Sequence, residues 1–219
     1  VLRISFVFRA GSALQQAPFS ASAAANLLAE GTHNMTAREV AEQLDYYGSW
    51  YDVNIDRDYA YINFATLSKF FDRTLAVAEE ILLRPTFPEE ELRTYAAKRR
   101  QRLAIDRTKV DVQAREAFAR ALFGAHHPYG ISSDEAEYDR LTRDDVADFH
   151  RRFYTAENCF VVCSGRIGEH ELQAVGALAA QLPHGEAETA IRFPAPETTH
   201  AAFVDHPGAV QSSLRLGRL

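Results

Sequence analysis

The chain has too few cysteines for a disulfide-stabilised domain, and it lacks the long apolar runs of a membrane protein. Its 219 residues include two cysteines, one methionine and one tryptophan. No apolar run approaches the roughly 20 residues that cross a bilayer, so the sequence predicts no membrane span in this chain. The formal net charge is −6, whereas a nucleic-acid binder needs a concentrated basic face. Composition therefore argues against disulfide-rich, membrane-spanning and nucleic-acid-binding proteins.

The two cysteines offer neither a disulfide nor a metal site. Cys159 and Cys163 lie four residues apart in one apolar segment. On a strand that spacing puts them on the same face but about 13 Å apart, and a disulfide needs Cα atoms within about 7 Å. We expect two small, buried, free thiols. There is also no glycine-rich phosphate loop and no G-x-S-x-G nucleophile motif, and nothing in the sequence predicts a compartment.

What is present is enough apolar sequence for a folded core, because 47% of the residues are hydrophobic. Alternating apolar residues predict strands, and apolar residues at helical spacing predict helices. The expected strands are residues 2–8, 50–55, 59–66 and 159–164. The expected helices are residues 21–30, 37–47, 70–82, 89–107, 112–122, 143–153 and 169–181. This order predicts an α+β fold, with an antiparallel sheet covered by helices.

Local signals fix some of these boundaries. Thr36 precedes a helix and Glu39 follows three residues later, which predicts a capping box. Thr142 is expected to cap its helix, with Asp144 and Asp145 in the first turn. Residues 54–58 are typical of a hairpin turn.

The most informative helix is the alanine-rich stretch from Ser22 to Asn26, which stands just before Gly31-Thr32. The frame around it resembles the insulinase/pitrilysin family of zinc peptidases. The resemblance covers about residues 1–183 and a tail at residues 203–217. It includes an alternating strand that ends in Gly11-Ser12, the turn His127-Pro-Tyr-Gly130, and a late apolar strand that ends in Gly165. It implies an insulinase/pitrilysin half-domain, like those of the mitochondrial processing peptidase.

In that family the same helix carries H-x-x-E-H, which supplies two zinc ligands and a general base. By this resemblance Ser22 and Asn26 stand at the histidine positions, and Ala25 stands at the glutamate position. A neutral hydroxyl and a neutral amide are poor zinc ligands, and a methyl group has no proton chemistry. We therefore predict no metal ligand, no other cofactor-binding residue and no catalytic residue at these positions, although zinc is the family's cofactor.

The family's third ligand is a glutamate on a later helix. In this chain residues 95–105 contain no carboxylate and four cations, and the nearest acid is Asp106. The cationic run Lys98–Arg102 is expected to be a solvated helix face, with docking of an acidic partner as the second interpretation. The histidines form no recognisable site: His126 and His127 fall in a loop, His33 follows the glycine turn, and His150 is expected at the surface of a charged helix.

The resemblance also divides the chain. Residues 1–183 are predicted to be a peptidase-like N-terminal domain without the zinc motif, and residues 184–200 have the composition of a linker. Residues 201–219 start a new strand pattern that resembles the opening of the family's second homologous half-domain, truncated here. The chain begins with Val1 inside a strand pattern, so we also expect a truncated start.

By this resemblance the chain is a non-catalytic member of a paired peptidase. It would bind peptide substrate and serve as a scaffold for a zinc-bearing homologous subunit in a heterodimer, and would be inactive alone. Two alternatives stay open: a structural assembly subunit like the respiratory-chain core proteins, and an active zinc endopeptidase with a non-standard site. The tyrosines Tyr51, Tyr59 and Tyr61 are expected to pack on the sheet, with contact to peptide as the second interpretation.

Overall fold

The structure, a computed structural model, describes residues 1–185, 195–196, 198 and 201–219. Contacts divide the chain into two units. The first comprises Val1–Arg93 and the described part of Leu141–Thr189, and the second comprises Thr94–Arg140 and the described part of Ala190–Leu219. The first unit holds the sheet and most helices, so the degenerate helix and its surroundings belong to it.

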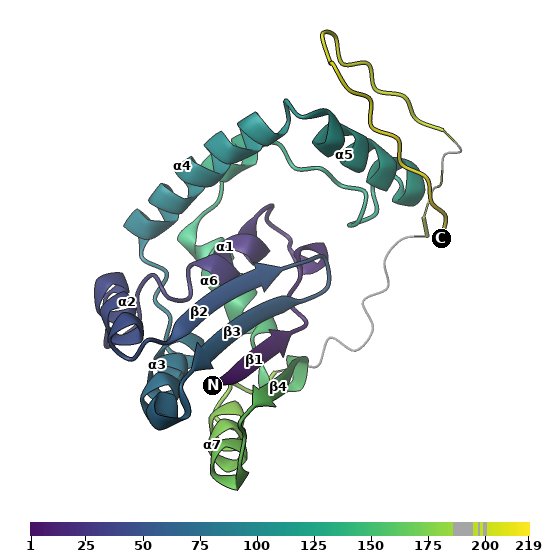
Figure 1. The fold of residues 1–219 in the computed structure, drawn as a ribbon. Helices are drawn as coiled ribbons and strands as arrows, with labels where there is room; N and C mark the ends of the chain where they lie inside the picture. Colours follow the sequence, from purple (N-terminus) through teal and green to yellow (C-terminus); the bar gives the residue numbers. More distant parts are fainter. Residues whose placement is uncertain (186–194, 197, 199–200) are drawn as a thin grey trace. The chain divides into compact units, whose positions relative to one another are not determined.

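The sheet of the first unit has four strands in the order β2-β3-β1-β4, and every neighbouring pair is antiparallel (Figure 1). The strands are β1 (Leu2–Phe8), β2 (Trp50–Ile55), β3 (Ala60–Thr66) and β4 (Cys159–Gly165). The helices of this unit are α1 (Ser20–Asn26), α2 (Ala37–Tyr46), α3 (Phe71–Leu83), α6 (Arg143–Phe153) and α7 (Glu169–Ala179). The predicted α+β fold is confirmed.

The core lies between one face of the sheet and the helices, and α6 passes behind the strands in Figure 1. Alternate residues of β1, from Leu2 to Phe8, are buried on this face, as expected for a strand with one face against the core. Phe6 meets Phe64 edge to face at 6.4 Å between ring centroids, and Phe8 lies 4.7 Å from Tyr154, just after α6. Each such side chain contributes about 1.5–3 kcal/mol when fully buried.

The capping predictions match the structure. Thr36 and Glu39 form both halves of a capping box at α2, and Thr142 forms the same arrangement with Asp145 at α6. The β2-β3 hairpin turns where expected, because the carboxylate of Asp56 accepts hydrogen bonds from the backbone N–H groups two and three residues later, both at 2.7 Å. The degenerate helix ends earlier than expected, at Asn26 rather than at residue 30.

The expectation that His150 lies at the surface is wrong. Its ring stacks on Tyr154 at 4.7 Å and meets Phe87 edge to face at 5.3 Å. Its Nε2 atom is buried and has no hydrogen-bond partner among the described residues. Burial lowers the pKa of His150 to about 4, because a charged imidazolium loses its hydration there. The charged residues next to His150 in the sequence suggested an exposed position, but His150 lies on the buried side of α6.

Both cysteines are free and half-buried. Burial raises the pKa of Cys159 to about 12 and that of Cys163 above its usual value, so both thiols stay protonated at neutral pH. These thiols pack as small apolar groups, as the sequence predicted, although neither is fully enclosed.

The second unit contains most of α4 (Glu89–Asp106) and all of α5 (Val110–Phe123). In the loop after α5, His127 is buried, stacks on Phe123 at 5.1 Å, and accepts a hydrogen bond at Nδ1 from the backbone N–H of Tyr129 at 3.1 Å. No helix in the described part of the chain is long and apolar enough to cross a membrane.

The predicted linker and second-domain start are seen only in part. Residues 186–194, 197 and 199–200 of the predicted linker lie outside the described residues. Residues 201–219 form no strand, because a strand needs a hydrogen-bonded neighbour and no described strand pairs with them. The boundaries at residues 183 and 200 stay a prediction; the contacts instead separate the units at Arg93 and Leu141.

Replacing His150 is expected to change how stability depends on pH. The pKa of His150 is lowered from 6.5 to about 4 in the folded state. Between these pH values His150 is therefore protonated in the unfolded chain and neutral in the folded chain. The folded state therefore loses about 2 kcal/mol from this group between pH 7 and pH 5. His150→Phe keeps the aromatic stack and should remove this loss, which denaturant unfolding at both pH values measures. The exposed His126→Gln is the control, and equal pH dependence in wild type and His150→Phe would contradict the account.

Candidate functional site

Ser22 and Asn26 of helix α1 turn their polar side chains onto nearby backbone carbonyl groups. The hydroxyl of Ser22 donates to the carbonyl oxygen of Phe19 at 3.0 Å. The amide of Asn26 donates to the carbonyl oxygen of Ser22 at 2.7 Å. Ala25, between them on the helix, has no exposed surface. The positions one helical turn apart are thus occupied by short side chains that bond within the helix.

These residues do not fit a zinc ion. Ser22, Ala25 and Asn26 offer no imidazole, thiolate or carboxylate. Their polar atoms also take part in backbone hydrogen bonds. Across the described residues, no group of three or more His, Cys, Asp or Glu side chains is placed to hold a metal ion. We therefore derive no reaction step through zinc at this helix.

The cationic stretch at residues 95–105 lies on α4, in the second unit. Arg100 bonds to Asp139 at 2.9 Å, and the guanidinium of Arg99 lies 5.3 Å from the ring centroid of Tyr95. Asp106 accepts from Lys109 and Arg102, and these contacts lower the pKa of its carboxyl group. Asp106, the acid nearest to this cationic stretch on its C-terminal side, is thus engaged by cations.

The loop that follows α1 is fixed to the end of α3. The backbone N–H of His33 donates to the carbonyl oxygen of Arg84 at 3.0 Å, and the N–H of Thr86 donates to the carbonyl oxygen of Gly31 at 3.0 Å. Gly31 has φ +144°, and a Cβ there would come within 3.0 Å of Pro88. Only glycine meets both demands, which accounts for Gly31 at this turn.

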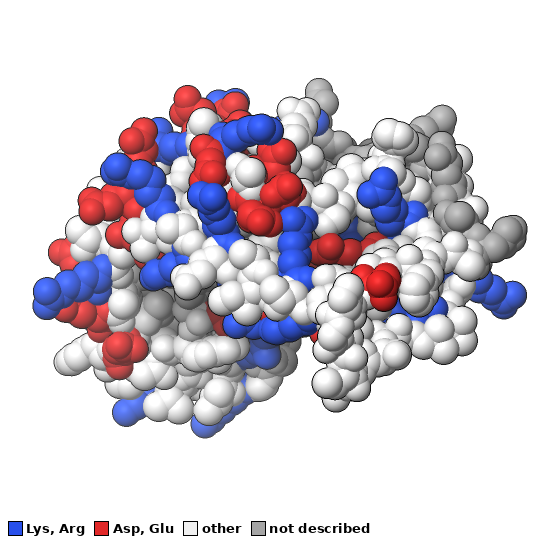
Figure 2. All heavy atoms as spheres, turned by 90° about the horizontal axis from the view of Figure 1, so that it is seen from above, with Lys and Arg blue, Asp and Glu red and all other residues white. Residues whose placement is uncertain are grey.

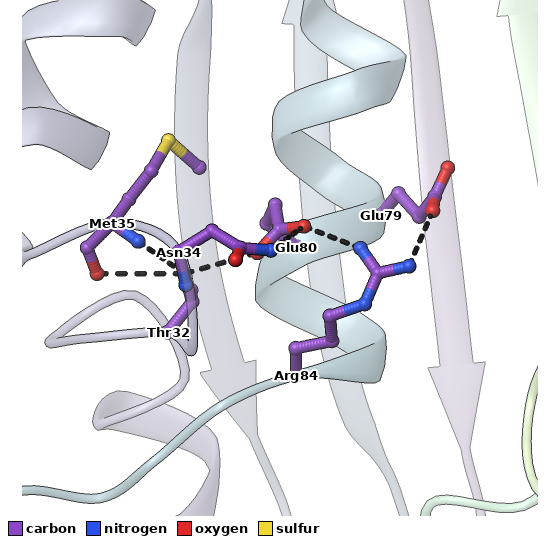
Figure 3. Close-up of polar contacts among 6 residues, drawn as sticks. All are labelled: Thr32, Asn34, Met35, Glu79, Glu80 and Arg84. Atoms are coloured by element: carbon purple, nitrogen blue, oxygen red, sulfur yellow. Dashed lines mark hydrogen bonds and ion pairs between the residues drawn. The ribbon is translucent and has the colours of Figure 1, made fainter.

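Glu80 of α3 holds the same loop through its side chain (Figure 3). Its carboxylate accepts hydrogen bonds from the hydroxyl of Thr32 at 3.2 Å and from the amide of Asn34 at 2.9 Å, and it forms an ion pair with Arg84. Burial alone would raise the pKa of Glu80, but the hydrogen bonds from Asn34, Arg84 and Thr32 outweigh it and lower the pKa. Arg84 also reaches Glu79 at 3.0 Å. A charged network therefore sets the position of the loop.

The loop forms one side of an open groove of about 610 Å³. Residues 30–39 and the first turn of α4 line it, and the carboxylates of Glu30, Glu39, Glu90 and Glu91 belong to the lining. Arg38 also lines the groove, but its guanidinium bonds to Glu42 at 2.6 Å. The groove is therefore acidic and has the charge to attract a basic segment.

His33 lines this groove. In the sequence it follows α1 by seven residues. Across the described residues it has no metal-binding group of three acids, cysteines or histidines around it. Elsewhere, basic and acidic side chains are interspersed on the face drawn in Figure 2.

Known proteins share this fold. Residues 140–218, from α6 through the C-terminal segment, match the sequence model of the peptidase M16 inactive domain. A crystal structure of a peptidase M16 inactive domain from Pseudomonas fluorescens superposes with a TM-score of 0.82 at 23% identity, over 89% of this chain and 48% of that one. Pitrilysin superposes with a TM-score of 0.75 at 16% identity, over 89% of this chain and 22% of pitrilysin.

The chain has the fold of an M16 peptidase domain. The resemblance to the insulinase/pitrilysin peptidases is thus confirmed. A curated relative, an uncharacterized zinc protease of Rickettsia bellii (strain RML369-C), is 24% identical over 160 residues, which is 72% of this chain and 39% of that protein. The chain spans less than half the length of these M16 relatives.

Sequence reasoning singled out the helix α1 but missed the network that holds the loop after it. Glu80 and Arg84 stand four residues apart on a helix, which is a readable signal for an ion pair. Thr32 and Asn34, however, lie more than 40 residues away in sequence. Only the fold brings them to the same carboxylate.

Removing the Glu80 carboxylate should loosen this loop. In Glu80→Gln the ion pair and the charge-assisted hydrogen bonds are lost, which should cost about 2 kcal/mol of unfolding free energy. Hydrogen exchange at the backbone amides of Thr32, His33 and Thr86 should speed up locally. Glu79→Gln is the matched control, since Glu79 bonds only Arg84 among these residues, and it should cost less than about 0.5 kcal/mol. Equal loss in both variants would contradict the role given to Glu80.

Proposed function

We propose that the chain is the non-catalytic partner of a zinc-bearing homologous peptidase and that it helps to hold the peptide substrate. One observation carries this proposal: within an M16-type fold, α1 presents Ser22, Ala25 and Asn26, whose side chains bond to their own helix or lie buried. A working hydrolytic zinc site needs ligands and a general base. This helix supplies neither, while the fold around it is intact.

The relatives support a pair of subunits of which one is catalytic and the other is not. The family model that matches residues 140–218 describes an inactive domain, and the superposed Pseudomonas protein is an inactive domain of the same kind. The Rickettsia relative is described as a zinc protease. Two kinds of chain of related sequence, one with zinc and one without, suit a heterodimer in which only one subunit cleaves.

The acidic groove supports a substrate-holding role. Its lining includes four glutamates and a loop that Glu80 and backbone hydrogen bonds hold in place. A pre-positioned site binds without first having to order itself. Basic segments of a peptide are the chemistry that such a groove attracts.

The proposal is tested by measuring peptide cleavage by the chain alone, by a zinc-bearing H-x-x-E-H homologue alone, and by their mixture. We expect the mixture to be at least about tenfold more active than either component, because substrate is held on two subunits. The homologue with its motif glutamate changed to glutamine is the control, and its mixture should be inactive. A stable complex without any gain in activity would instead favour the structural assembly role. Cleavage by the chain alone with stoichiometric zinc would overturn the proposal.

The groove is tested separately in the active mixture. The double variant Glu90→Gln/Glu91→Gln should raise KM for a lysine- or arginine-rich peptide several-fold and leave kcat nearly unchanged, because it removes binding that is equal in substrate and transition state. A neutral peptide of the same length is the control substrate. The same KM for both peptides in wild type and variant would show that the groove does not contact substrate.

A further inference from the structure

The connection between α3 and α4 forms part of the wall of the acidic groove. Thr86 and Pro88 of this connection line the groove, and so do Glu90 and Glu91 in the first turn of α4. The carbonyl oxygen of Pro88 accepts a hydrogen bond from the backbone N–H of Leu92 at 3.0 Å, so this turn of α4 continues directly from the connection. The path of the connection therefore decides where the two carboxylates lie.

Within this connection the backbone of Phe87 is strained. Its φ angle is +48°, a left-handed conformation that is rare for a residue with a bulky side chain. Such a conformation persists only where the surrounding contacts hold it, and residues of this kind cluster at functional sites. The ring of Phe87 is 3% exposed and meets the ring of His150 edge to face. Packing of the ring is thus one contact that holds the turn.

The second contact comes from Arg143, the first residue of α6. Its Nε atom donates hydrogen bonds to the carbonyl oxygens of Thr86 at 3.2 Å and of Phe87 at 3.1 Å, and its Nη2 atom donates to the carbonyl oxygen of Thr86 at 3.0 Å. A guanidinium presents its donors in a rigid fork. This shape suits two neighbouring carbonyl groups of one turn.

The position of Arg143 within α6 indicates that it serves this connection rather than its own helix. Thr142 is the N-cap of α6, so Arg143 stands in the first turn together with Asp144 and Asp145. The helix dipole favours anions at this end and disfavours cations. The two aspartates follow this rule and Arg143 does not. Its place is explained by the carbonyl groups that it binds, which lie 57 and 56 residues earlier in the sequence.

The other side of the connection is fixed to the loop after α1. The backbone N–H of Thr86 donates to the carbonyl oxygen of Gly31 at 3.0 Å, and Thr32 forms an isolated antiparallel bridge with Pro85. The connection is therefore held between this loop and α6, and Arg143 supplies hydrogen bonds from the side of α6.

We propose that Arg143 is a positioning residue of the acidic groove. By holding the left-handed turn at Phe87, it fixes the start of α4 and so places Glu90 and Glu91 in the groove wall. Arg143 is not among the described residues that line the groove, and it acts on binding through the backbone of the connection. This inference rests on the proposed function, because it takes the groove to hold a basic segment of peptide.

The sign of the effect separates positioning from simple electrostatics. If Arg143 acted only through its charge, Arg143→Gln would make the surroundings of the groove more acidic and strengthen the binding of a basic peptide. If Arg143 positions the groove wall, the same substitution weakens that binding. The side chain is exposed at the surface, so the variant should stay folded.

The test measures binding of a fluorescein-labelled peptide rich in lysine and arginine to the 219-residue chain by fluorescence anisotropy. Arg143→Gln should bind this peptide about threefold or more weakly than wild type, because the carboxylates that attract it are displaced. Hydrogen exchange at the backbone amides of Thr86 and Leu92 should speed up in the same variant. Arg151→Gln is the matched control, since it removes an arginine of α6 that bonds to Asp148 at 2.8 Å, and it should change neither measurement. Arg143→Lys keeps the charge and part of the bonding, so its binding should lie between those of wild type and Arg143→Gln.

Unchanged or tighter binding by Arg143→Gln would overturn the proposal, and so would equal weakening in Arg151→Gln. A wild-type chain that binds the basic peptide no better than a neutral peptide of the same length would remove the substrate role of the groove, and this inference with it. The two failures are distinguishable, because the first leaves the preference of wild type for the basic peptide intact. Neither result depends on a zinc-bearing partner, since the assay contains the chain alone.

Discussion

The structure depends on close packing of α1 against α6 and the sheet. Ala21, Ala23, Ala24 and Ala25 have no exposed surface, and side chains this small let a helix lie close to its neighbours. The same closeness leaves little room for larger side chains on the buried side. The sequence resemblance predicts that this helix stands at the zinc motif's position, and in this structure its alanines serve packing.

That constraint is consistent with the proposal that the frame is kept without zinc chemistry at α1. The loop after α1 is held by backbone bonds and by Glu80 of α3, independently of the side chains at Ser22 and Asn26. The groove beside it is formed by this loop and the first turn of α4. None of the described bonds that support this groove involves Ser22, Ala25 or Asn26.

Much of the fold was readable from sequence, because strand alternation and capping residues are local signals. The strands, the antiparallel order expected for hairpins, the capping box at Thr36 and the N-cap at Thr142 all follow from residues within a few positions. His150 was misplaced because a charged helix can still bury one side. The pairing of Thr32 with Glu80 was unreadable because it depends on contacts between distant segments. The strand expected after residue 200 needs a partner that no described strand provides.

The central claim is that α1 holds no zinc, and zinc binding tests it most directly. The purified chain is dialysed against a small excess of zinc and its bound metal measured, beside the variant Asn26→Ala. The account predicts no stoichiometric zinc in either protein, since the residues at α1 offer no ligand set. One zinc per chain that is lost in Asn26→Ala would contradict it.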